Sequence, residues 1–345
     1  MKQEHLEKIV QPLIEWFKQN GRILPWRESK NPYKIWLSEI MLQQTKIEAV
    51  KKYYTRFLEE IPTIQDLATV EEEKLLKLWE GLGYYNRARN LKKAAIILQE
   101  KYQGKMPATY QELMELPGIG EYTAGAIASI AYQEKVPAVD GNVLRVMARV
   151  TEDRQNVLLP EVKKQVTKRL ISIMPKEAGI FNEAIMELGE LVCLPNGGPL
   201  CNKCPLQGYC LAYKKSLTEE IPVRQKKQVR KKEKKTVFIF CNKGKIAIQK
   251  REKRGLLAGM YEFPNTEGYV TKEELETLLA RWNLTASKIT PIGKYQHTFS
   301  HKEWEMKGYV IDAEQQNTQF QWVTKQELLE KYPIPTAFSG FKEKI

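Results

Sequence analysis

The chain has 345 residues, 42% of them hydrophobic, and this length predicts two folded domains rather than a disordered polymer. Its 55 basic and 42 acidic side chains give a net charge of +13, which favours a polyanionic partner such as nucleic acid. No run of about 18 apolar residues occurs, so we expect no membrane span. The first 21 residues carry three glutamates in an amphipathic pattern, which predicts a helix rather than a signal peptide. We therefore expect a cytoplasmic chain whose five cysteines are not in disulfides.

Residues 1–214 have a helical pattern with short connections between the apolar stripes. Asn31 followed by Pro32 predicts a capped helix start for the segment PYKIWLSEIMLQQT. Further helices are predicted at 47–58, 71–79, 87–99, 110–115, 122–131, 142–150, 160–173 and 181–192. The sequence therefore predicts an all-α first domain over residues 1–214.

A basic run, RQKKQVRKKEKK, occupies residues 224–235 with eight basic residues and one glutamate. Runs of this kind predict a solvated linker, here over 215–235, and such a linker either only connects domains or also lies along phosphates. After it, TVFIFCNKGKIAIQKR predicts two strands around a glycine turn. A capping box from Thr271 to Glu274 predicts a helix through Trp282. With further strands at 288–295 and 303–312 and a helix at 325–331, residues 236–345 are predicted to form an α+β domain.

Four of the five cysteines lie within eighteen residues and are separated by seven, two and five residues. They are Cys193, Cys201, Cys204 and Cys210. Four thiolates so close in sequence can converge on one metal centre, and both zinc and a four-iron cluster accept four cysteines. The fifth, Cys241, lies in a strand pattern and is expected to be an ordinary core residue.

Two carboxylates stand in contrasting local patterns. Glu39 lies on the apolar stripe of its predicted helix, and burial there would raise its pKa and favour a proton donor. The alternative is a buried glutamate satisfied by a basic partner. Asp140 comes just before a predicted helix, where it would be an N-cap whose pKa is lowered by backbone amides and the helix dipole. One raised and one lowered carboxyl is an arrangement used in glycosidic-bond chemistry.

Three further segments suit contact with DNA. Gln43 and Gln44 end the Glu39 helix, where they are either surface residues or amides that contact base edges. The segment GLGYYNRARNL (81–91) carries aromatic tips between glycines, which predict either a plain helix connection or a wedge into the base stack. In LPGIGEYTAGA (116–126), Gly118 and Gly120 form a two-glycine turn between helices, where backbone N–H groups can approach a phosphate closely.

Together these segments resemble the helix-hairpin-helix DNA glycosylases, and among them the family of adenine DNA glycosylases. The resemblance covers essentially the whole chain. It rests on LPWR (24–27), SEIMLQQT (38–45), GLGYYNRARNL, LPGIGEYTAGAI, VDGNVLRV (139–146), FNEAIMELG (181–189), the cysteine loop and HTFSH (297–301). It implies a monomeric enzyme, associated with the nucleoid, that hydrolyses the N-glycosidic bond of adenine opposite 8-oxoguanine or guanine in double-stranded DNA during base excision repair.

The resemblance also implies roles for particular residues. Glu39 matches the acid that protonates adenine, and Asp140 matches the carboxylate that stabilises the oxocarbenium ion or briefly bonds to the sugar. Asn142 and Tyr122 match residues that support these two carboxyls, and Glu183 and Arg27 match residues that bind the substrate. Gln44 and Tyr84 match residues that insert into the duplex. Gly118 and Gly120 would contact the phosphate backbone of the DNA. The four cysteines match the ligands of a [4Fe–4S] cluster. The C-terminal domain resembles a Nudix fold, in which the loop Phe299, Ser300 and His301 would recognise 8-oxoguanine.

Two departures from the family pattern stand out. The first cysteine gap, LPNGGPL, has seven residues where the family usually has six. The C-terminal domain carries TKEELETLL where Nudix hydrolases carry Arg-Glu-x-x-Glu-Glu, so we expect a binding domain without pyrophosphatase activity. Two alternatives remain: an endonuclease III-like glycosylase with lyase activity, or a non-catalytic mismatch-binding protein. Tyr122 stands where the lyase would carry its lysine, and the pair of carboxylates disfavours the non-catalytic protein.

Overall fold

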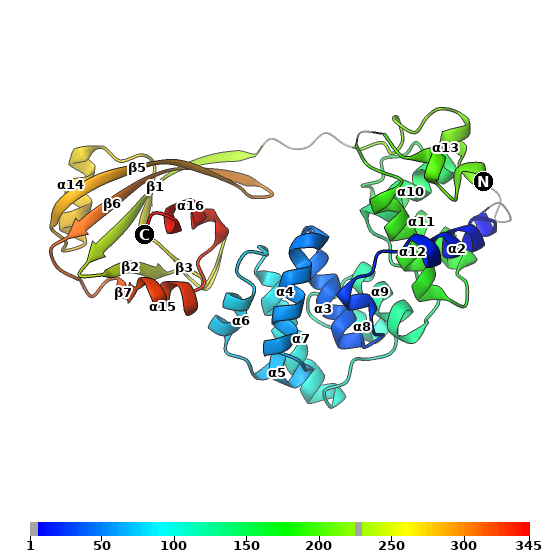
Figure 1. Cartoon of the computed structure of the whole chain (residues 1–345), viewed down its shortest axis with the longest axis horizontal. Coiled ribbons are helices and arrows are strands. Elements are labelled where there is room, and N and C mark those ends of the chain that lie inside the picture. Colours follow the sequence, from blue (N-terminus) through cyan, green and yellow to red (C-terminus); the bar gives the residue numbers. More distant parts are fainter. Residues whose placement is uncertain (1–5, 197, 225–229) are drawn as a thin grey trace. The chain divides into compact units, whose positions relative to one another are not determined.

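The computed structural model describes residues 6–196, 198–224 and 230–345. Their contacts divide the chain into two compact units, Met1–Thr69 with Arg89–Lys226, and Val70–Ala88 with Lys227–Ile345. Figure 1 shows helices throughout the first unit and a sheet with flanking helices in the second, which confirms the predicted fold class. No helix in the described ranges is long and apolar enough to cross a membrane.

The first unit is built from helices whose predicted positions hold to within a few residues. They are α2 (Val10–Asn20), α3 (Pro32–Leu42), α4 (Ile47–Glu60), α5 (Ile64–Thr69), α7 (Asn86–Tyr102), α8 (Tyr110–Met114), α9 (Glu121–Tyr132), α10 (Gly141–Thr151), α11 (Pro160–Ile173), α12 (Ala178–Leu191) and α13 (Leu211–Lys214), with the 3-10 turn η1 (Pro25–Arg27) before α3. The short helices α5 and α13 were not predicted. The start of α7 lies in the segment that groups with the second unit.

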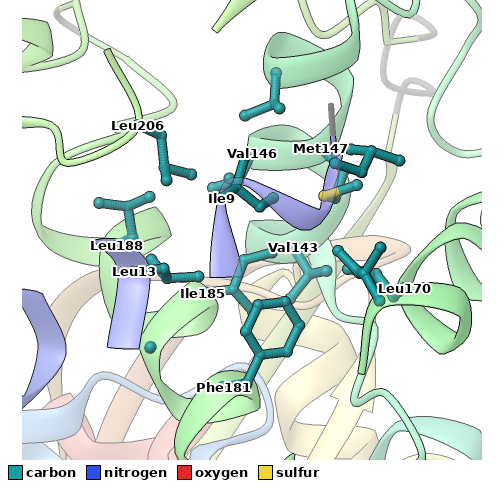
Figure 2. Packing of buried hydrophobic residues seen from close by; sticks show 14 of the residues in the cluster. Ile9, Leu13, Val143, Val146, Met147, Leu170, Phe181, Ile185, Leu188 and Leu206 are labelled. Carbon is teal, nitrogen blue, oxygen red and sulfur yellow. The ribbon is translucent and has the colours of Figure 1, made fainter. Parts of the chain in front are cut away.

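One buried apolar cluster joins the N-terminal helix α2 to α10, α11 and α12 (Figure 2). Phe181, Leu188 and Val143 lie in it with at most 1% of their surface exposed. Leu206, from the segment between two of the cysteines, packs into the same cluster. Burial of such side chains stabilises the fold by roughly 1.5–3 kcal/mol each. The core therefore fixes α10 and α12 and ties the cysteine loop to them.

The second unit contains a seven-stranded mixed sheet with the order β3-β2-β1-β6-β5. Its strands are β1 (Lys231–Asn242), β2 (Lys245–Lys250), β3 (Tyr261–Glu262), β4 (Asn265–Glu267), β5 (Ala286–Thr298), β6 (Lys302–Ala313) and β7 (Gln321–Thr324). Strand β4 pairs with β1 and β7 with β2, while β1 and β6 are parallel. Helix α14 (Lys272–Arg281), with its capping box, covers one face, and α15 (Lys325–Glu330) and α16 (Ser339–Lys342) lie at the other.

Two boundaries differ from the sequence prediction. Residues 231–235, predicted as linker, form the first part of β1 because each pairs with a residue of β6 between Lys302 and Met306; residues 225–229 of the basic run lie outside the described part. Val70–Ala88 groups with the second unit, where Glu73 of α6 (Glu72–Leu78) accepts hydrogen bonds from Lys250 and Tyr261.

Candidate active site

Glu39 lies inside the first unit on α3. Asn31 caps this helix by accepting hydrogen bonds from the backbone N–H groups of Tyr33 and Lys34, as predicted. The Glu39 side chain is buried, with 6% of the residue exposed, and Tyr122 Oη donates a hydrogen bond to its Oε2 at 2.5 Å. Burial raises the pKa of Glu39 to about 7, although the bond from Tyr122 acts in the opposite direction. This carboxyl therefore changes its protonation state near neutral pH, as the apolar stripe predicted.

Asp140 is the N-cap of α10 and accepts a hydrogen bond from Val143 N at 2.8 Å and another from Asn142 Nδ2 at 2.9 Å. The prediction that this cap would lower its pKa was wrong. Burial raises the pKa of Asp140, and the bonds from Val143 and Asn142 oppose that rise without cancelling it. Both carboxyls are thus shifted upward, because tertiary burial outweighs the local cap.

Two glycines allow the backbone around Asp140 to pack closely. A Cβ atom at Gly125 of α9 would lie 2.4 Å from the carbonyl oxygen of Pro137, in the segment that leads to Asp140. A Cβ at Gly189 of α12 would lie 2.6 Å from Cβ of Asn142. Both distances are shorter than van der Waals contact, so any larger residue at either position would push the Asp140 loop away from its helix neighbours.

A chain of hydrogen bonds leads from Asp140 to the first cysteine. Asn142 Oδ1 accepts a bond from a terminal nitrogen of Arg145 at 2.8 Å, and Arg145 Nε donates to the carbonyl oxygen of Cys193 at 2.8 Å. Arg149, one turn later on α10, donates to Cys193 Sγ at 3.2 Å. Neither arginine was predicted as a site residue, although their i, i+4 spacing beside the apolar stripe of α10 is visible in the sequence.

Arg27 of η1 and Glu183 of α12 form an ion pair close to these two carboxyls. Arg27 Nε donates to Glu183 Oε1 at 2.9 Å, and a terminal nitrogen of Arg27 donates to Glu187 Oε2 at 3.0 Å. Burial raises the pKa of Glu183, while the charge of Arg27 lowers it. Glu187 and Arg22, which complete this group, were not predicted, and their separation of 165 residues left no local signal.

A single cavity of about 780 Å³ brings most of these side chains together. Its lining includes the predicted site residues Arg27, Glu39, Gln44, Tyr122, Asp140, Asn142 and Glu183, together with Trp26, Leu24 and Met186. A cavity in which several polar and charged groups converge beside apolar side chains is the usual form of a ligand-binding or active site. Met186 Sδ lies 3.3 Å from the same Tyr122 Oη.

The other predicted site residues lie outside this cavity. Gly118 and Gly120 are exposed in the turn between α8 and α9 around the buried Ile119, and Gly118 has φ = +80°, which favours glycine. Tyr84 is 48% exposed, with φ = +48°. The residues Phe299, Ser300 and His301 form the loop between β5 and β6 in the second unit.

The four clustered cysteines line one further, largely apolar cavity together with Arg149, Val146 and Leu206. Burial raises the pKa of Cys204 to about 12 and also raises that of Cys201 and Cys210. Four thiols around one cavity fit a metal cluster, and the Arg149 guanidinium supplies positive charge beside Cys193. Within the described residues, no three acidic, histidine or cysteine side chains are grouped closely enough to hold a single metal ion.

Comparison with known proteins finds a family match for each of two parts of the chain. Residues 37–176 match the model of the HhH-GPD superfamily of base excision DNA repair proteins, and residues 236–344 match that of the NUDIX domain. The adenine DNA glycosylase of Buchnera aphidicola subsp. Baizongia pistaciae is 36% identical over 84% of this chain and 82% of its own length. This chain belongs to the adenine DNA glycosylase family. The human adenine DNA glycosylase is 32% identical over 91% of this chain and 70% of its own length.

The glycosylase also resembles solved structures over its helical part. A thermostable thymine-DNA glycosylase is 28% identical over 61% of this chain and 98% of its own, with a TM-score of 0.56. A non-covalent complex of endonuclease III with DNA is 29% identical over 63% of this chain and 99% of its own, with a TM-score of 0.53. The enzyme is an adenine DNA glycosylase of base excision repair, and its substrate is DNA.

Proposed function

We propose that this glycosylase releases adenine mispaired with 8-oxoguanine or guanine in double-stranded DNA. The observation that carries the proposal is the buried Glu39, whose pKa is about 7, in the same cavity as Asp140. A carboxyl with a pKa near the working pH is an efficient general acid, and a second carboxylate nearby can stabilise positive charge.

In the proposed reaction, Glu39 transfers its proton to a ring nitrogen of adenine. The bond between C1′ of the deoxyribose and adenine then breaks, and its electron pair leaves with the base. Asp140 in its ionised form stabilises the resulting oxocarbenium ion, with Asn142 and Tyr122 holding the two carboxyls in place. Water adds to C1′ and loses a proton, which leaves an abasic site.

Glu183 and Arg27 are proposed to hold the extruded adenine, because their ion pair lines the cavity. Base flipping is least costly at a mismatched or damaged pair. Gln44 and Tyr84 would fill the space in the duplex, and Gly118 and Gly120 would contact the phosphate backbone. The loop of the second unit with the partly buried Phe299 and the exposed Ser300 and His301 would recognise 8-oxoguanine.

We further propose that Cys193, Cys201, Cys204 and Cys210 hold a [4Fe–4S] cluster. When bound, the cluster would join the segments around these cysteines into one rigid loop, whose lysines suit phosphate contact. Iron and sulfide analysis with an absorption spectrum of the purified protein tests this. Brown protein with about four irons per chain is expected, and colourless protein that contains zinc but no iron would contradict the assignment.

The function is tested by single-turnover assays on duplexes that carry adenine opposite 8-oxoguanine, guanine or thymine. We expect free adenine from the first two duplexes, with the fastest release opposite 8-oxoguanine. If no adenine appears from the 8-oxoguanine duplex, the proposal fails.

The lyase alternative deserves its own test because of the likeness to endonuclease III. Strand cleavage through an imine needs an amine, and the phenol of Tyr122 cannot form one. The product should therefore be an intact abasic strand. A borohydride-stable adduct between the protein and the substrate strand would show that a lyase step takes place.

A further inference from the structure

A fourth carboxylate of the cavity lining, Glu187, binds both Arg22 and Arg27. Glu187 lies on α12 one turn after Glu183, and 2% of the residue is exposed. Its Oε1 accepts hydrogen bonds from the backbone N and from Nε of Arg22, at 2.9 and 2.8 Å. Its Oε2 accepts bonds from terminal nitrogens of Arg22 and Arg27, at 2.8 and 3.0 Å. A buried carboxylate with four such bonds has a fixed position.

Glu187 also determines how the guanidinium of Arg27 is oriented. Three nitrogens of that guanidinium have different partners: Nε donates to Glu183, one terminal nitrogen to the carbonyl oxygen of Arg22 at 3.0 Å, and the other to Glu187. Two of these three contacts, to Glu187 and to the backbone of Arg22, are made by the terminal nitrogens, which leaves Nε for Glu183. Glu183 is therefore held by an arginine that Glu187 holds in turn.

The charges of this group act on Glu39. The groups that influence Glu39 are Tyr122 from α9, Asp140 at the start of α10, Glu183 from α12 and Arg27 from η1. Arg27 favours the ionised form of Glu39, whereas Glu183 and Asp140 favour the protonated form. Although burial raises the pKa of Glu187, bonds from Arg22 and Arg27 lower it to about 2, so Glu187 carries a constant negative charge at neutral pH.

We propose that Glu187 is a positioning residue for adenine release: it orients Arg27 toward Glu183 and partly neutralises the charge that Arg27 directs at the acid Glu39. This proposal rests on the proposed roles of Glu39 and Glu183. Without the Glu187 carboxylate, less negative charge would offset the positive charge of Arg27. The pKa of Glu39 would then fall, so Glu39 would lose its proton at a lower pH.

The test is the pH dependence of single-turnover adenine release by the full-length Glu187→Gln enzyme. The alkaline limb of the rate should move to lower pH by about half a unit, which makes the rate at pH 8 about threefold lower than that of the wild type. The matched control is Glu190→Gln, since Glu190 is exposed and contacts Arg22 at 3.1 Å. The rate of Glu190→Gln should decline at the same alkaline pH as that of the wild type.

A second variant separates charge from packing and serves if Glu187→Gln does not fold. Arg22→Gln removes the side-chain bonds from Arg22 to Glu187 but leaves the carboxylate, so its limb should move to higher pH. A purely structural role for Glu187 would slow both variants and leave both limbs at the wild-type pH, which would overturn the proposal. The wild-type rate should decline at alkaline pH, and Glu39→Gln should abolish that decline. If either observation fails, the proposed function fails instead.

Discussion

The catalytic cavity and the 299–301 loop differ in how firmly their functional groups are held. In the cavity, Glu39 is buried and accepts a hydrogen bond from Tyr122 of α9, and the half-buried Asp140 accepts bonds from Val143 and Asn142 of the helix that it caps. In the loop, Ser300 and His301 are exposed, and Ser300 Oγ lies 3.4 Å from Nδ1 of its own neighbour. Desolvation raises the pKa of both carboxyls in the first region, whereas exposure would let the second contact a base in DNA, as proposed. Changes in the cavity should therefore affect the rate, and changes in the loop should affect the choice of substrate.

The largest effect is expected for Glu39→Gln, which removes the proton donor and keeps the shape of the side chain. Single-turnover release of adenine should fall by about 10³-fold, within the range that general acid catalysis contributes. The affinity for the mispaired duplex should change little, because binding does not use that proton. Release of adenine at the wild-type rate would remove Glu39 from the mechanism.

The next effect concerns the pH at which the wild-type rate declines. Glu39 has a pKa of about 7 and donates a proton only while protonated, so release should slow as pH rises through 7. The bond from Tyr122 lowers the pKa of Glu39. In Tyr122→Phe that pKa should therefore rise, and the alkaline limb should move upward by about one pH unit. A limb at the wild-type pH would mean that another group produces it.

The sequence predicted features that depend on local pattern. The helix over residues 160–173 has the predicted ends, Asn31 and Thr271 cap their helices, and Glu39 is buried as its apolar stripe implied. These features follow from spacing within one turn of a helix.

What the sequence missed depends on residues far apart in the chain. The pKa of Asp140 was predicted in the wrong direction because a cap is visible locally, but the burial imposed by α9 and α12 is not. Pairing with β6 turned part of a basic run into strand β1. Likewise, Glu187 and Arg22 meet across 165 residues.

In the second region, Ser300→Ala should change the choice of substrate rather than the rate. Loss of one hydrogen bond to 8-oxoguanine would cost about 0.5–1.5 kcal/mol, which lowers the preference for 8-oxoguanine over guanine by about two- to tenfold. The measurement is the ratio of release rates on the two duplexes. Unchanged discrimination would mean that Ser300 takes no part in recognition.

The smallest effect is expected at the base of the loop. Glu233 on β1 accepts a hydrogen bond from Lys302 Nζ at 2.8 Å and from Trp304 Nε1 at 3.0 Å, and the ring of Trp304 packs edge-on against Phe299 with centroids 4.8 Å apart. Glu233→Gln keeps the size of this side chain but weakens its charge-assisted bonds.

The variant weakens the contacts that hold the base of the loop, but it leaves the side chains of residues 299–301 unchanged. Discrimination between 8-oxoguanine and guanine should therefore fall by only about threefold, and the rate opposite guanine should not change. Glu305→Gln is the matched control, since Glu305 pairs with Lys232 instead. If the two variants discriminate equally well, Glu233 does not support recognition. A slower rate on both duplexes in Glu233→Gln would instead couple the loop to the chemistry, and the distinction between the two regions would no longer hold.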